Sequence, residues 1–178
     1  MKADRMTTDL VRLTAGSPFP DLTWPLTDGS SLSLASMEGW RLLVIYRGAH
    51  CPLCRGYLHT LEGLQAGFAE AGIAVAALSS DPRDRAVREA AEEVWTFPVG
   101  HDLTEAQMRQ LGLYVSSPRS PEETDRNFAE PGLFVINPQG AIQIVDISNA
   151  PFARPDLEGL LNGLKFVIAK DYPIRGTV

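Results

Sequence analysis

The fold of this chain is decided by the stretch RGAHCPLCR, residues 47–55. It follows an apolar run, residues 42–46, that is typical of a buried strand. It precedes residues 55–71, where apolar side chains recur at spacings of three and four and predict a helix. Both cysteines of the protein, Cys51 and Cys54, therefore lie where a strand passes into a helix.

This junction favours a reactive thiolate. The free N–H groups and the positive dipole end of a helix stabilise a negative charge, and Arg47 and Arg55 add two cations beside the pair. Pro52 fits the first helical position, because its missing N–H would have had no partner there. We expect Cys51, just outside the first turn, to be the exposed thiol with the lower pKa. Cys54, one turn inside, is placed to attack a disulfide or sulfenic acid formed on Cys51.

The C-x-x-C spacing allows other interpretations. In a chain with no other cysteine and a neighbouring β-α-β pattern it favours redox chemistry, but half of a zinc site and a pair of inert core thiols remain open. Zinc usually takes four ligands, and the local candidates are His50 and His59. We expect no metal and no bound cofactor, and we interpret His59 as a surface or packing residue and His101 as a loop residue.

Composition indicates one globular domain, residues 16–178, preceded by a polar arm, residues 1–15. The chain has 178 residues, of which 44% are hydrophobic and 21% charged. A formal net charge of −6 without a basic stripe argues against nucleic acid or an anionic membrane as a partner. The first residues carry charges with no apolar stretch after them, so we expect a cytoplasmic protein.

Periodicity and turn residues predict the remaining elements and an α/β fold. Residues 116–130 are polar and indicate a mobile excursion that covers the thiols. The expected elements are a hairpin over residues 21–34 with its turn at Asp28-Gly29, a strand over 73–78, a helix over 82–94 capped by Asp81, a short strand over 97–99, a helix capped by Asp102 or Thr104 and ending at Leu111, a hairpin over 132–147 and a helix over 155–168.

With YRGAHCPLCR at its centre, this order resembles the thioredoxin-fold peroxiredoxins, in particular the C-x-x-C branch of the alkyl hydroperoxide reductase/thiol-specific antioxidant (AhpC/TSA) family. The similarity spans about residues 16–170 and includes VAALSSD (75–81), FPV (97–99) and PGLFVINPQG (131–140). It implies a thioredoxin-like fold, with a central mixed β-sheet flanked by helices and an N-terminal β-hairpin extension. In that fold the proline before the last hairpin is cis and lies beside the cysteines, which makes Pro131 the candidate.

The same resemblance implies a thiol peroxidase acting on hydrogen peroxide or alkyl hydroperoxides. Cys51 would be the peroxidatic cysteine and Cys54 the resolving one, with Arg47 as the cation that assists. A thioredoxin-type or glutathione donor would restore the dithiol, and the protein would form a homodimer. Typical members have a proline and a Thr or Ser ahead of the peroxidatic cysteine, where this chain has Val44 and Gly48, and an arginine before the final hairpin, where it has Glu130-Pro131.

Two further functions remain open. A thioredoxin-like thiol-disulfide oxidoreductase would use the same pair on protein or small-molecule disulfides. A carboxylate on the strand before the motif would favour that class, because it could accept a proton from the second thiol. The strand over residues 42–46 offers none. The other open function is that of a non-enzymatic redox sensor or metal-binding protein, with residues 116–130 as the surface that binds its partner.

Overall fold

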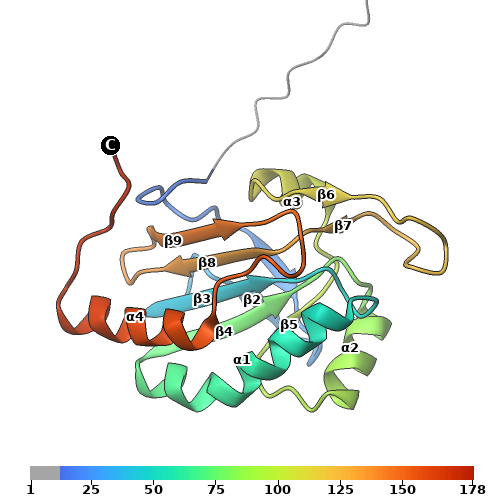
Figure 1. The fold of residues 1–178 in the computed structure, drawn as a ribbon, viewed down its shortest axis with the longest axis horizontal. Helices are drawn as coiled ribbons and strands as arrows, with labels where there is room; N and C mark the ends of the chain where they lie inside the picture. Colours follow the sequence, from blue (N-terminus) through green and yellow to red (C-terminus); the bar gives the residue numbers. More distant parts are fainter. Residues whose placement is uncertain (1–12) are drawn as a thin grey trace, which may run out of the picture.

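A computed structural model describes residues 13–178, so residues 1–12 of the predicted arm, with Leu10 and Val11, lie outside the described part. Its centre is a five-stranded sheet in the order β5-β4-β3-β8-β9 (Figure 1). The elements are β1 (Thr23–Pro25), β2 (Ser31–Ser33), β3 (Trp40–Ile45), α1 (Pro52–Glu70), β4 (Ile73–Leu78), α2 (Arg83–Glu92), β5 (Val99–Gly100), α3 (Glu105–Gln110), β6 (Val115–Ser116), β7 (Phe128–Ala129), β8 (Gly132–Ile136), β9 (Ile142–Ile147) and α4 (Leu157–Ala169).

The sheet is mixed, as expected. β3, β4 and β5 run parallel, whereas β8 pairs antiparallel with both β3 and β9. Both faces of β3 are covered, which explains the continuous apolar run of residues 42–46. The expected α/β, thioredoxin-like architecture is confirmed.

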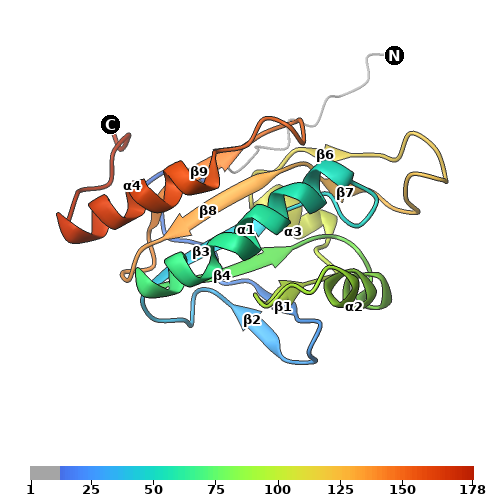
Figure 2. The ribbon, with the colours of Figure 1, turned by 60° about the horizontal axis from the view of Figure 1, so that its bottom comes forward.

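Helices and a hairpin cover the two faces of the sheet. α1 and α4 lie side by side on one face, where Leu58, Leu61 and Phe68 of α1 and Leu161 and Leu164 of α4 are buried (Figures 1 and 2). The β1–β2 hairpin and α3 pack against the other face. The cysteines belong to the first of these two cores, so the pair lies between α1 and the sheet.

The strand before the motif begins earlier than the apolar run suggested. β3 starts at Trp40 and includes Arg41, which is buried. Its guanidinium donates hydrogen bonds to the backbone carbonyls of Leu34, Met37 and Asn137. These hydrogen bonds offset the cost of burying the cation, whose Nε has no partner, and they tie the entry of β3 to the β8–β9 turn.

One expected helix cap is wrong and another is confirmed. α2 begins after Pro82, which has no capping side chain, and the carboxylate of Asp81 is bound elsewhere. The prediction that Asp81 caps this helix is therefore wrong. Of the two candidates for the next helix, Thr104 is the cap, because its hydroxyl accepts from the N–H of Gln107 in a capping box.

The expectation of a cis bond at Pro131 is also wrong, since no peptide bond in residues 13–178 is cis. The chain passes straight from β7 into β8, and the Pro131 carbonyl accepts from the N–H of Ser148. Extended backbone suits the trans form, which X-Pro bonds favour by about 0.5–1 kcal/mol. The predicted polar excursion is bounded by two short strands, β6 and β7, that pair with each other.

No helix within residues 13–178 is both long enough and apolar enough to cross a membrane.

Candidate active site

The approach to the motif is held by a carboxylate from the neighbouring strand. Asp81 follows β4 and is buried, and its Oδ2 accepts a hydrogen bond from the N–H of Ala49 at 2.7 Å. Gly48 adopts a positive φ of 122°, and a Cβ there would lie 2.6 Å from that same Oδ2. A Thr or Ser at this position would collide with Asp81, so the glycine and the carboxylate are matched.

Cys51 is the N-cap of α1. Its Sγ accepts the N–H of Cys54 at 3.3 Å, and its carbonyl accepts the N–H of Arg55 at 3.1 Å. Pro52 occupies the first helical position, as expected. Cys51 is only 2% exposed, so the prediction of an exposed thiol is wrong. Glu123 from the segment between β6 and β7 pairs with Arg47, and Phe128 of β7 packs against Arg47 and His50, so these segments cover the motif.

The two thiols have opposite tendencies to ionise. The sulfurs lie 2.7 Å apart, with the Cys54 thiol donating to Cys51. The pKa of Cys51 is lowered to about 6, and the largest cause is this donated hydrogen bond. The Cys54 N–H and Arg47 lower it further, whereas burial raises it. The same hydrogen bond, together with burial, strongly raises the pKa of Cys54. Near neutral pH the reduced pair is therefore a thiolate on Cys51 and a thiol on Cys54, as a nucleophile with its resolving partner requires.

Arg47 stands beside Cys51, as the sequence suggested. Its Nη1 lies 3.8 Å from the Cys51 sulfur, and its guanidinium lies over the ring of Phe128, 4.7 Å from the ring centre. It also forms ion pairs with Glu123 at 3.5 Å and Glu130 at 3.3 Å. Glu130, at the position where the family resemblance leads us to expect an arginine, is thus a counter-ion for Arg47.

A second arginine reaches Cys54 from a distant part of the chain. Nη2 of Arg154, in the loop between β9 and α4, lies 3.1 Å from the Cys54 sulfur. The guanidinium lies over the ring of Tyr57, 4.8 Å from its centre. The Tyr57 hydroxyl donates to the carbonyl of Pro155 at 2.8 Å, which fixes the loop against α1.

The other cation and the local histidines are engaged elsewhere. Arg55 donates to the carbonyl of Ala49 and pairs with Glu93, and neither contact involves a sulfur. His59 is a surface residue paired with Glu93 at 2.6 Å, as interpreted. His50 packs against Phe128, and burial lowers its pKa, so its ring is neutral. Within the described range, His, Cys, Asp and Glu side chains form no cluster of three that could hold a metal ion.

His101 is buried in the loop after β5, and its Nδ1 lies 2.7 Å from Oδ2 of its neighbour Asp102.

Residues 116–130 pack against the motif through a charged network. Arg85 of α2 bridges Asp81 at 3.0 Å and the hydroxyl of Thr124 at 2.9 Å, and it also pairs with Asp125. Glu123 from the same segment pairs with Arg47. The segment is thus attached to the carboxylate and the cation that flank Cys51, and Figure 1 shows it extending beyond the sheet between β6 and β7.

Sequence reasoning missed two residues of this site. Asp81 could have been found, because it follows the strand next to β3 and the carboxyl ends of parallel strands meet at one edge of a sheet. Arg154 carries no such signal, since it lies 100 residues after Cys54 in an irregular loop. Of the four expected site residues, Cys51, Cys54 and Arg47 lie together. No hydrogen bond among the described residues joins Pro131 to a sulfur, and its place beside the pair stays a prediction.

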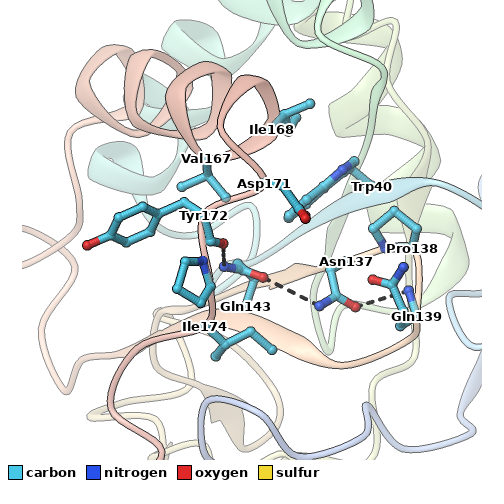
Figure 3. A pocket seen from close by; sticks show the side chains of 11 residues that line it. Trp40, Asn137, Pro138, Gln139, Gln143, Val167, Ile168, Asp171, Tyr172 and Ile174 are labelled. Carbon is cyan, nitrogen blue, oxygen red and sulfur yellow. Dashed lines mark hydrogen bonds between the residues drawn. The ribbon is translucent and has the colours of Figure 1, made fainter.

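A pocket of about 360 Å³ lies away from the cysteines, between the C-terminal part of α4 and the β8–β9 turn (Figure 3). Trp40 lines one side, and the amide of Gln143 links the Asn137 side chain to the carbonyl of Tyr172. Its lining holds no thiol and no histidine, so we place the candidate active site at the cysteine pair instead.

Comparison with known proteins identifies the family of this chain. Rv2521 of Mycobacterium tuberculosis, which is named as a peroxiredoxin, is 30% identical over 108 residues, 60% of this chain and 69% of that protein. The thiol-disulfide oxidoreductase ResA of Oceanobacillus iheyensis is 26% identical over 138 residues, 77% of this chain and 64% of its own length. A solved mutant of peroxiredoxin 6 of Arenicola marina matches with a TM-score of 0.74 at 19% identity, covering 90% of this chain and 76% of the other. The sequence model of the AhpC/TSA family matches residues 15–145. The chain therefore belongs to the AhpC/TSA family.

Proposed function

We propose that this protein is a thiol peroxidase that reduces hydrogen peroxide or alkyl hydroperoxides through Cys51. The observation that carries the proposal is the Cys51 sulfur at the N-cap of α1, hydrogen-bonded by Cys54 and 3.8 Å from Arg47. A thiolate in that position is stable near neutral pH, and the thiolate is the form that attacks a peroxide.

The reaction begins with attack of the Cys51 thiolate on the terminal oxygen of the peroxide. The O–O bond breaks, Cys51 becomes a sulfenic acid, and the alkoxide or hydroxide leaves and takes up a proton. Arg47 is placed to stabilise the negative charge that develops on the leaving oxygen. Cys54 then condenses with the sulfenic acid to form a disulfide and release water.

A dithiol donor of the thioredoxin type, or glutathione, would return the pair to its reduced form. The cytosol suits this cycle, because a reducing compartment keeps such a pair turning over rather than permanently oxidised. A homodimer stays a prediction of the family resemblance.

A second candidate function is thiol-disulfide exchange on a protein or small-molecule disulfide. The C-x-x-C pair and the likeness to ResA support it. In this reaction Cys51 would attack the substrate disulfide, and Cys54 would resolve the mixed disulfide.

The test is stopped-flow oxidation of the reduced protein by hydrogen peroxide, followed by intact mass, with reduction of an insulin disulfide measured in parallel. We expect rapid loss of about two mass units in the wild type, no reaction in Cys51→Ser, and addition of oxygen to Cys51 without a disulfide in Cys54→Ser. Thiols that ignore peroxide but reduce insulin would replace the peroxidase with the second candidate. Full turnover by Cys51→Ser would overturn both.

A further inference from the structure

An arginine side chain contacts each cysteine sulfur, Arg47 at Cys51 and Arg154 at Cys54, but the two arginines differ in their counter-ions. Arg47 shares its charge with Glu123 and Glu130 as well as with Cys51. Arg154 has a single hydrogen-bond acceptor among the described residues, the Cys54 sulfur, and its buried Nε and Nη1 have no partner. A guanidinium that forms no ion pair with any described residue is thus held against the resolving cysteine.

The surrounding structure fixes Arg154 in that place. The guanidinium lies on the Tyr57 ring, one helical turn after Cys54, and the Tyr57 hydroxyl is bound to the residue that follows Arg154. The next residue along, Asp156, caps α4 by accepting the N–H of Gly159 at 2.6 Å. The loop therefore cannot move away from α1 without breaking the stack and the hydrogen bond, and the cap fixes its other end to α4.

The charges around Cys54 change during the proposed reaction. In the reduced pair the Cys51 thiolate and burial keep Cys54 protonated, against the opposing effects of Arg154 and the backbone of Arg47. Burial raises the pKa of the neighbouring Tyr57, and among the charges that act on its hydroxyl Arg154 lowers this pKa, whereas the carboxylates of Asp146 in β9 and Asp156 at the start of α4 raise it. Oxidation turns Cys51 into a neutral sulfenic acid, so the repelling charge disappears while Arg154 stays.

We propose that Arg154 is a second catalytic arginine, which stabilises Cys54 as the thiolate that attacks oxidised Cys51. In that step the Cys54 thiolate attacks the Cys51 sulfur, the S–S bond forms, the S–O bond breaks, and the hydroxide that leaves takes up a proton to become water. In the return step a donor thiolate attacks the Cys51 sulfur, and Cys54 departs as a thiolate beside Arg154. The first of these steps rests on the proposed peroxidase function, whereas the second serves disulfide exchange equally.

The first experiment measures ionisation alone and needs no activity. In Cys51→Ser the neutral serine stands in for neutral, oxidised Cys51, and the thiolate absorbance at 240 nm reports Cys54. A cation in contact lowers a thiol pKa by about 1–3 units, so adding Arg154→Met should move the titration up by that amount. Arg154→Lys should recover part of the difference. Arg175→Met is the matched control, because Arg175 also lies over a tyrosine ring, that of Tyr172, and should leave the titration unchanged.

The second experiment follows oxidation of the otherwise native protein by hydrogen peroxide across pH. A sulfenic acid trap reports the oxidation of Cys51, and intact mass reports the disulfide. We expect disulfide formation in Arg154→Met to slow by about tenfold or more near pH 7 and its pH profile to shift upward, because less Cys54 is ionised. The rate of disulfide formation in Arg154→Lys should lie between those of the otherwise native protein and Arg154→Met.

Three results separate the possibilities. Equal titration of Cys54 with and without Arg154, or equal loss in Arg154→Met and Arg154→Lys, would overturn the role proposed for Arg154. Failure of Cys51 to oxidise in the protein with Arg154 intact would instead overturn the peroxidase function. In that case the titration in Cys51→Ser would still decide the inference.

Discussion

Replacing Cys54 with alanine should make Cys51 a weaker acid, because the thiol of Cys54 is the largest cause of the lowered pKa of Cys51. The Cys54 N–H stays in place, so the change removes the thiol donor to the Cys51 thiolate and, with the sulfur, the acceptor of Arg154. A hydrogen bond to a charged group is worth about 1.5–3 kcal/mol, which corresponds to about 1–2 pKa units.

The magnitude decides how the variant behaves at neutral pH. With a pKa of about 6, roughly 90% of Cys51 is thiolate at pH 7. With a pKa higher by about 1–2 units, that fraction falls to roughly 10–50%. The rate of alkylation by iodoacetamide at pH 7 should fall in proportion, and it should recover at higher pH.

Cys54→Ser is the matched control, since its hydroxyl can donate to the Cys51 sulfur whereas alanine cannot. Both variants contain one thiol, so the pH dependence of alkylation belongs to Cys51 without ambiguity. We expect Cys54→Ser to keep a lower pKa than Cys54→Ala. Identical profiles for the two variants, both near the wild-type value, would refute the role assigned to the donated hydrogen bond.

Two further predictions concern stability. Gly48→Ala should lower the free energy of unfolding by about 1–3 kcal/mol in urea denaturation, because Gly48 has a φ of 122° and its new Cβ would meet Asp81. Gly56→Ala is the control: its Cβ on α1 has open space around it, so this change should raise the free energy of unfolding by about 1 kcal/mol. Equal effects of Gly48→Ala and Gly56→Ala would contradict this reasoning. Glu89 is buried beside Tyr46, and burial raises its pKa from 4.5 to about 7. The folded protein therefore holds this proton more tightly than the unfolded chain, so unfolding free energy should fall by about 3 kcal/mol between pH 4.5 and about 7. Glu89→Gln should remove most of that slope, and a slope unchanged in the variant would assign it to other groups.

Much of the fold followed from local patterns. The period-three-and-four spacing of apolar residues placed α1 and α4 within a few residues, and the Asp28-Gly29 turn placed the β1–β2 hairpin. These signals are strong because each helix or hairpin pairs the hydrogen-bonding groups of its own backbone, and because the spacing of its apolar residues shows which face is buried. The caps were harder to place, since Asp81 suits the start of α2 but its carboxylate binds the N–H of Ala49, and local sequence left both Asp102 and Thr104 as candidates for α3.

The burial of Cys51 shows where local reasoning stops. The N-cap position correctly indicated a stabilised thiolate, because that stabilisation comes from the first turn of its own helix. Exposure depends on what packs over the turn, and Phe128 and Glu123 come from a segment more than 70 residues away that contacts Arg47. Nothing in residues 47–55 carries that information.

The sequence by itself determined the local setting of the pair: both thiols lie at the start of one helix, Cys51 is the more acidic of the two, and Arg47 stands beside it. Those properties arise from neighbours along one strand, one turn and one helix, whose geometry local periodicity reveals. The tertiary structure alone decided the rest of the site, namely the carboxylate of Asp81 behind Gly48, the counter-ions of Arg47 and the contact of Arg154 with Cys54. Each of these joins segments distant in the chain, and which side chain meets which is set by the order and register of the strands and by the loops that leave them.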